Sequence, residues 1–191
     1  MKLAYFTDKN FSNHDFTTEP PEKGEYENCE FAGCDFSGID FSEFIFSECV
    51  FTGCNLSLVK LEKTALRDCR FRECKMLGVN FENCNPFGLS FVFENCNLGN
   101  ASFFGLKIKG TRFKNSNLEE VDFTGCDLAG AVFEQCDLKG AIFDNTNLEK
   151  ADFRTASQYS INPENNKIKK AKFAMPWVLG LLDRYNIEIE N

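Results

Sequence analysis

The sequence predicts an all-β fold in which the chain winds as a four-sided coil, and three observations support it. A large apolar residue, most often Phe, recurs at every fifth position over most of the chain. A Cys or another small residue stands two positions before many of these centres. Pairs of Cys, such as Cys29 with Cys34 and Cys49 with Cys54, recur every twenty residues. A period of five fits neither a helix nor a flat strand, so a turn must follow each short extended unit.

Each five-residue unit is expected to place two side chains inside the coil. Alternation along an extended chain points the small residue and the central residue to the same side. The two polar residues after the centre then turn the chain into the next unit, as in CDFSG (34–38) and AIFDN (141–145). Stacking of successive coils buries the centres as one continuous core. The predicted core includes Phe31, Phe36, Phe41, Phe51, Phe113, Phe123, Phe133 and Phe143.

Four units are expected to close one coil. A third pair, Cys69 with Cys74, repeats the twenty-residue interval of the first two. From Phe113 to Phe153 the centres alternate Phe and Leu, a ten-residue period that fits twenty and excludes fifteen. In a four-sided coil Phe therefore stacks on Phe and Leu on Leu.

The repeats predict one domain over residues 1–156. Units in register occupy 26–153, which corresponds to about seven coils of a solenoid. The pattern breaks near 17–25, and at 82–92 the register shifts by two residues. We expect a small bulge or loop at 82–92, with Phe87 packing over the side of the coil.

Residues 157–191 are predicted to form a loop and a C-terminal module. Pro176 suits the first turn of a short helix, Asn186 suits its end, and the alternation in 187–190 suggests a short strand. The helix would carry an amphipathic stripe, which fits either a cap on the last core layer or a two-fold interface between two solenoids. The residues of this candidate interface are Phe173, Trp177, Val178, Leu181, Leu182, Tyr185 and Ile187.

Composition narrows the class of protein. The formal net charge of −8 and the pI of about 4.8 make direct nucleic-acid binding unexpected. No stretch approaches the roughly 18–20 apolar residues of a membrane span, and the first residues do not resemble a signal peptide. We therefore expect a cytoplasmic protein whose ten Cys stay reduced.

The Cys residues are expected to be small buried thiols. Stacked Cys would lie one strand spacing apart, about 4.8 Å, with parallel Cβ vectors, whereas a disulfide needs Cβ atoms about 3.8 Å apart and turned together. A zinc site needs convergent ligands and is not expected, since His14, the single His, is near the N-terminus; with one His, no His-centred triad can be assembled. We expect no metal, no cofactor and no catalysis. A β-helix enzyme, the rival interpretation, would require a deep pocket.

The pattern of a small residue, Asp or Asn, and Leu or Phe followed by two further residues resembles the pentapeptide-repeat family. That resemblance implies a right-handed quadrilateral β-helix. Within the family the chain is similar to a branch that contains albicidin-resistance, microcin B17 immunity and plasmid quinolone-resistance proteins. The similarity is carried by CNLSL (54–58), CKMLGVN (74–80), YSINPENNKIKKAKF (159–173) and the C-terminal module.

The branch resemblance implies a function by DNA mimicry. Such a protein is expected to occupy the DNA-binding saddle of DNA gyrase, or of topoisomerase IV, and to protect the enzyme from a poison. The resemblance also implies a homodimer paired through the C-terminus. A repeat scaffold for an unrelated cytosolic partner is the alternative.

The distribution of charge fits this interpretation better than the total does. Residues 115–153 hold nine acidic and two basic residues, a net charge of −7. Two coils span about 10 Å, so this segment carries about one charge per 1.4 Å, comparable to one per 1.7 Å in duplex DNA. A basic collar precedes it, formed by Lys60, Lys63, Arg67, Arg70, Arg72 and Lys75. The predicted acidic face comprises Glu119, Glu120, Asp122, Asp127, Glu134, Asp137, Asp144, Glu149 and Asp152.

Overall fold

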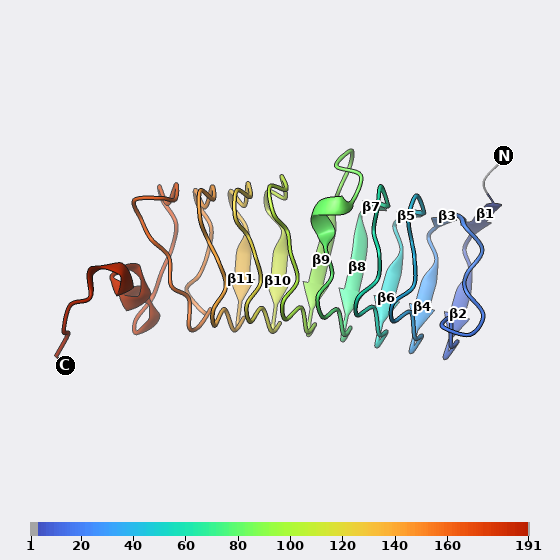
Figure 1. The fold of residues 1–191 in the computed structure, drawn as a ribbon, viewed down its shortest axis with the longest axis horizontal. Helices are drawn as coiled ribbons and strands as arrows, with labels where there is room; N and C mark the ends of the chain where they lie inside the picture. Colours follow the sequence, from blue (N-terminus) through green and yellow to red (C-terminus); the bar gives the residue numbers. More distant parts are fainter. Residues whose placement is uncertain (1–3, 191) are drawn as a thin grey trace.

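The computed structural model describes residues 4–190 as a rod of stacked coils, with the two chain termini toward its opposite ends (Figure 1). Successive coils pair in parallel at an interval of twenty residues, so that Phe11 lies beside Phe31, Phe31 beside Phe51 and Phe51 beside Phe71. This interval confirms the four-sided coil. We name its sides A, B, C and D in chain order.

Side A begins as a four-stranded parallel sheet near the N-terminus. Beyond the sheet, single bridges continue the side through Lys107, Asp127, Asn147 and Lys167. The strands of side A are β1 (Ala4–Thr7), β3 (Gly24–Glu27), β5 (Ile45–Ser47) and β7 (Ala65–Arg67).

Side B carries a seven-stranded parallel sheet that extends farther along the rod. Its order places each strand beside the strand of the next coil, and bridges continue it from Val132 to Asp152 and Lys172. The strands of side B are β2 (Asn10–Ser12), β4 (Glu30–Ala32), β6 (Val50–Thr52), β8 (Cys69–Arg72), β9 (Phe91–Glu94), β10 (Arg112–Lys114) and β11 (Val132–Glu134).

Sides C and D are built from single bridges instead of strands. On side C they link Asp15, Asp35, Asn55 and Lys75, and continue beyond these to Ser157. On side D they link Asp40 with Lys60, and further along they link Asn80, Ser102, Asp122 and Ile142. The residue before each core centre thus makes the lateral contact between coils.

The core is one apolar column along the axis, and all eight predicted Phe are buried in it. Rings from successive coils stack face to face, with centroids 4.8 Å apart for Phe31 and Phe51 and 5.2 Å apart for Phe113 and Phe133. All ten Cys are free and buried, as predicted. Eight of the thiols donate weak hydrogen bonds to carbonyls of the previous coil, and the Cys54 Sγ lies 3.3 Å from the Phe31 oxygen.

The chain departs from the twenty-residue interval at 82–92, as the register shift predicts. Phe71 pairs with Phe93 and Asn80 bridges to Ser102, an interval of twenty-two residues. The two additional residues are accommodated in a loop at 84–90 that follows the 3₁₀ helix η1 (Phe81–Asn83). The prediction for Phe87 is wrong: its side chain is 78% exposed. The core is already filled at this level by Phe81 and Phe91, which leaves no site for the ring.

The sequence at 17–25 interrupts the residue pattern but leaves the coil intact, because β1 pairs with β3 at the regular interval. At the other end the coil continues past residue 156. Asn147 bridges to Lys167 and Asp152 to Lys172, so that Phe173 stacks on Phe153. The segment 157–172, which we expected to lie outside the repeats, therefore supplies part of a further coil.

The C-terminal module consists of two 3₁₀ helices, η2 (Trp177–Leu181) and η3 (Asp183–Tyr185), and η3 ends at Asn186 in the left-handed region. The predicted strand at 187–190 is absent, because no neighbouring segment pairs with it and Ile187 and Ile189 are both exposed. Gly180 brings η2 against the coil: a Cβ there would lie 1.9 Å from the Tyr159 oxygen. Within residues 4–190 no helix is long and apolar enough to cross a membrane.

Candidate partner-binding surface

The nine predicted acidic residues surround the rod and do not form one face. Because each five-residue unit turns onto the next side, acids that are close in sequence point in different directions. This corrects the prediction of a single acidic face. Side A carries Asp127 and Glu149, side B carries Glu134 and Asp152, side C carries Glu119 and Asp137, side D carries Asp122 and Asp144, and Glu120 lies at the corner between C and D.

Basic side chains compensate most of the acids on sides A and B. Asp127 lies 3.2 Å from the Lys109 ammonium, and Glu134 lies 3.8 Å from Arg112. Asp152 contacts the Arg154 guanidinium at 2.7 Å, which lowers the pKa of its carboxyl. Such exposed pairs add little stability, but they cancel the local charge that a cationic partner would meet.

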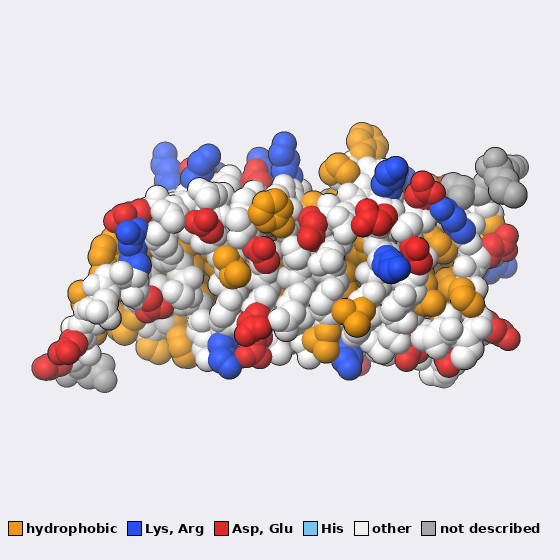
Figure 2. Space-filling model, viewed as in Figure 1, with side chains coloured by type: hydrophobic (Ala, Val, Ile, Leu, Met, Phe, Trp, Pro, Cys, Tyr) orange, Lys and Arg blue, Asp and Glu red, His pale blue; other side chains and the backbone are white. Residues whose placement is uncertain are grey.

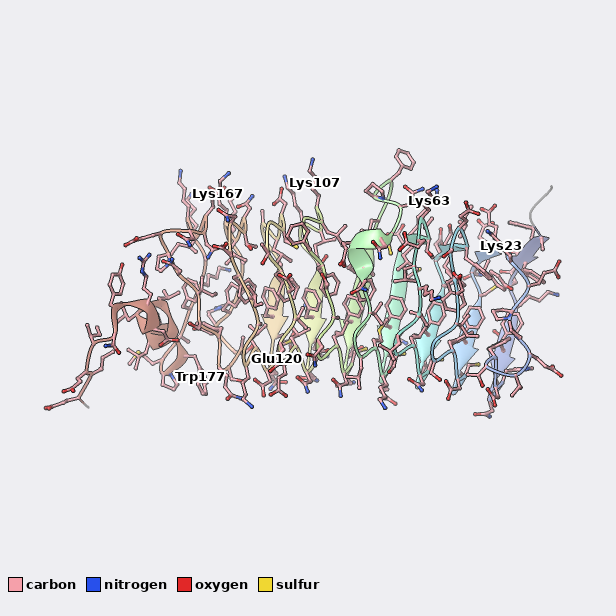
Figure 3. The ribbon with its side chains drawn as sticks, viewed as in Figure 1. Lys23, Lys63, Lys107, Glu120, Lys167 and Trp177 are labelled. Atoms are coloured by element: carbon pink, nitrogen blue, oxygen red, sulfur yellow. The ribbon has the colours of Figure 1, made fainter. Side chains whose placement is uncertain are left out.

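The acids on sides C and D remain largely uncompensated. Glu119 is paired, at 2.8 Å from Lys139. Among the described residues, Glu120, Asp122, Asp137 and Asp144 have no Lys, Arg or His nitrogen within 4.0 Å. We call these four residues the acidic edge. In Figure 3, Glu120 lies along the border of the rod opposite the one from which Lys107 projects.

Two members of the acidic edge also hold corners of the coil. The Asp122 carboxylate accepts a hydrogen bond from the backbone N–H of Thr124 at 2.8 Å, and Asp137 accepts one from Lys139 at 3.0 Å. Asp144 instead accepts from the Asn165 side chain, while Glu120 is exposed at a corner. Glu120 and Asp144 could therefore contact a partner without breaking a backbone hydrogen bond that holds a corner of the coil.

The basic collar is distributed round the rod in the same way. Lys60 is on side D, Arg67 on side A, Arg70 and Arg72 on side B, and Lys75 on side C, with Lys63 at a corner. The geometry assigns it no single contact surface. Sequence reasoning missed a second basic group, the lysines of side A beyond the loop. In Figure 2 basic side chains project along the upper border over the C-terminal coils. The sequence could have revealed these lysines, because outward positions separated by multiples of twenty residues lie on the same side of the rod.

The predicted interface residues separate into two sets. Phe173 and Leu181 pack against the core, and the Phe173 ring lies 5.4 Å from that of Phe153, so these two residues cap the last layer. Trp177, Leu182, Tyr185 and Ile187 are 36–55% exposed and form an apolar surface at the C-terminal end of the rod, and Val178 is partly buried.

The described residues contain no group of three or more His, Cys, Asp or Glu that could hold a metal ion. The Cys thiols lie in an apolar column, and burial raises the pKa of Cys49, Cys126 and Cys136 to about 12. Thiols held in the neutral form are poor nucleophiles and poor metal ligands.

Comparisons with known proteins agree with this architecture. Full-length QnrB1, a plasmid-mediated fluoroquinolone resistance protein, superposes with a TM-score of 0.60 at 18% identity, covering 96% of this chain and 100% of its own. A trypsin-treated variant of QnrB1 gives 0.48 at 22% identity, with 99% of each chain covered. HetL, involved in heterocyst differentiation regulation in the cyanobacterium Nostoc, gives 0.40 at 16% identity, covering 90% of this chain and 89% of its own. The likeness to full-length QnrB1, at 18% identity, shows a shared fold.

The comparison with curated protein sequences found no match. The family model described as the pentapeptide repeat region matches residues 25–91, 78–153 and 96–174, which together span most of the coil. The repeat, the twenty-residue parallel coil and this match agree: the chain belongs to the pentapeptide repeat family.

Proposed function

We propose that this protein is a non-catalytic DNA mimic that binds DNA gyrase, and also topoisomerase IV, and protects the enzyme from a topoisomerase poison. The observation that carries the proposal is the acidic edge, where four carboxylates with no basic partner among residues 4–190 lie on adjacent sides of successive coils. Neighbouring coils are about 4.8 Å apart, so the edge presents closely spaced negative charge along a narrow rod.

A cationic DNA-binding saddle is the kind of surface that such an edge attracts. Enzymes that bind duplex DNA neutralise phosphates with Lys and Arg, and a rod with fixed carboxylates competes for the same side chains. Long-range charge also accelerates the encounter. The fold shared with a fluoroquinolone resistance protein supports this choice of partner. A complex with DNA gyrase would also place the protein in the cytoplasm, where that enzyme acts.

The exposed apolar end supports a homodimer. Trp177, Tyr185 and Ile187 are 42%, 48% and 55% exposed, and a second copy seated on them would cover a patch that faces water in a single chain. Two rods joined at this end would double the length of the acidic edge.

The test measures gyrase supercoiling and poison-stabilised DNA cleavage, with albicidin or a fluoroquinolone, at micromolar protein. We expect the wild-type protein to reduce cleavage and Glu120→Lys/Asp144→Lys to lose at least tenfold in potency. The matched control, Glu134→Lys/Glu149→Lys, makes the same charge change in the same segment on sides A and B, and should keep its potency. Absence of any wild-type effect would refute the proposal.

The alternative is a repeat scaffold for an unrelated cytosolic partner. A pulldown with the wild-type chain distinguishes the two. Gyrase subunits retained by the wild type and lost in Glu120→Lys/Asp144→Lys favour the topoisomerase, whereas a different protein lost in the same variant favours the scaffold.

A further inference from the structure

We propose that side A is a self-complementary surface through which two copies of the chain lie antiparallel, side by side. The first observation is that side A changes sign along the rod. Its N-terminal half carries five acidic residues and one arginine, a net charge of −4. Its C-terminal half carries six lysines and two acidic residues, a net charge of +4.

The acidic half comprises positions on β1, β3, β5 and β7 and on the corners that follow them. Among the described residues none of its acids lies within 4.0 Å of a basic nitrogen. Lys23 and Lys63 stand at the corner with side D, where Lys23 is paired with Glu43. The acids are Asp8, Glu25, Glu27, Glu48 and Asp68.

The basic half is also uncompensated, apart from one pair. Lys109 contacts Asp127, whereas the other five lysines have no acidic oxygen within 4.0 Å among the described residues. Lys107 and Lys167 project along the same border of the rod as the loop at 84–90 (Figure 3). The lysines are Lys107, Lys109, Lys150, Lys167, Lys169 and Lys170. Like charges gathered this way repel one another and are costly unless something covers them.

The second observation is that the change of sign falls at the midpoint of side A. Four strands precede the loop at 84–90, and four bridged positions, at Lys107, Asp127, Asn147 and Lys167, follow it. A two-fold axis through the loop therefore lays the β1 layer of one copy against the Lys167 layer of the other, and the β7 layer against the Lys107 layer. The same contact is made twice, as an isologous interface requires.

The geometry favours a second copy over a polyanion. A nucleic acid along side A would meet four net positive charges and then four net negative charges, whereas an antiparallel copy meets the opposite sign in both halves. Near the axis, the exposed Phe87 of each loop gives the two copies an apolar contact. This surface is on the flank of the rod and is separate from the apolar C-terminal end.

Sedimentation equilibrium of the full chain tests the proposal at 50 mM and 500 mM salt, in the wild type and with Trp177→Asp, which removes any pairing through the C-terminus. We expect Trp177→Asp to associate at 50 mM salt, and at least tenfold more weakly at 500 mM, because the Debye length shortens from over 10 Å to a few ångströms. In this background Glu25→Lys/Glu27→Lys and Lys167→Glu/Lys169→Glu should each stay monomeric. The control Glu30→Lys/Glu73→Lys, with the same change on side B and at its following corner, should associate as before.

The decisive arm mixes the two charge-reversed variants in equal amounts. In the mixed pair one contact keeps the wild-type charges. In the other contact both facing halves carry reversed charges, on the β3 layer of one copy and on the Lys167 layer opposite the neighbouring β1 layer, so association should return. Its return also shows that both variants are folded. A mixture that stays monomeric overturns the proposal. So does a Trp177→Asp protein that is monomeric at 50 mM salt, including one that instead binds a duplex oligonucleotide through these lysines.

Discussion

At the scale of single residues, the five positions of the repeat have separate physical roles. The residue before the centre is often Asp or Asn because its side chain accepts the N–H two residues later, as Asp35 does from Ser37 at 2.8 Å. Hydrogen bonding from the Ser37 side chain, together with this backbone bond, lowers the pKa of the Asp35 carboxyl, since both favour the charged form. Some of the carboxylates of this protein therefore stabilise the corners of the coil, and only the others are free to contact a partner.

The buried thiols predict a pH dependence of stability. The folded chain keeps Cys126 and Cys136 protonated up to about pH 12, whereas an exposed thiol ionises near 9.0. The unfolded state therefore loses its protons first, and the free energy of unfolding falls as the pH rises above about 9, by about 1.4 kcal/mol per cysteine at pH 10. Urea unfolding at pH 7.5 and 10 measures this fall. In Cys126→Ala/Cys136→Ala the fall should be smaller, and an unchanged fall would contradict the assignment.

At the scale of the five-residue element, the corner decides the fold. The residue two positions after the centre adopts a positive φ, at 68° for Gly105, 56° for Glu120 and 55° for Glu48. Only Gly adopts this region without strain, and side chains there cost about 1 kcal/mol. The chain tolerates many of these corners because each one positions a buried centre and a lateral hydrogen bond.

Substitution of two glycines separates backbone strain from steric contact. At Gly105 an added Cβ meets nothing within 4 Å, but its φ is +68°, so Gly105→Ala should lower the free energy of unfolding by about 1 kcal/mol through the backbone alone. At Gly99 the φ is ordinary, and the nearest atom is 3.4 Å away. Gly99→Ala should be close to neutral. Urea unfolding of both variants checks this, and equal effects would argue against corner strain.

At the scale of the whole molecule, the rod is a stack whose last layer must be covered. Repeat stacks expose an apolar layer at each end unless a different segment closes them. Phe173 and Leu181 close the C-terminal end, while the apolar residues beyond them face solvent. The module can therefore act both as a cap and as an interface, two roles that belong to different residues.

Two substitutions distinguish these roles. Phe173→Ala should lower the free energy of unfolding by about 2 kcal/mol, less than the 3–5 of a fully buried Phe, because the ring is partly exposed and stacks on Phe153. Trp177→Asp should leave that free energy within about 0.5 kcal/mol but halve the native mass in light scattering at 500 mM salt, where pairing through side A is weakened. An unchanged mass together with a large loss of stability would make Trp177 part of the cap.

The sequence was sufficient for the fold because the repeat is local and regular. The five-residue period, the twenty-residue Cys interval and the register shift at 82–92 all reappear in the pairing of the strands. It was less reliable for unique segments, such as Phe87, the strand expected at 187–190 and the end of the coil near 156. The conformation of each of these segments depends on whether another segment lies close enough to pack or pair with it. A repeat period in the sequence does not contain that information.

By itself the sequence determined what lies inside the rod, because alternation and spacing fix which side chains point to the axis. Only the tertiary structure decided which charged side chains share a side of the rod, and therefore what kind of partner each side could bind. The coil carries acids that are adjacent in the sequence to different sides and brings lysines from distant coils onto one side. A charge acts over a distance of ångströms through space, so its effect depends on the side of the rod it occupies and on the ion pairs it makes there.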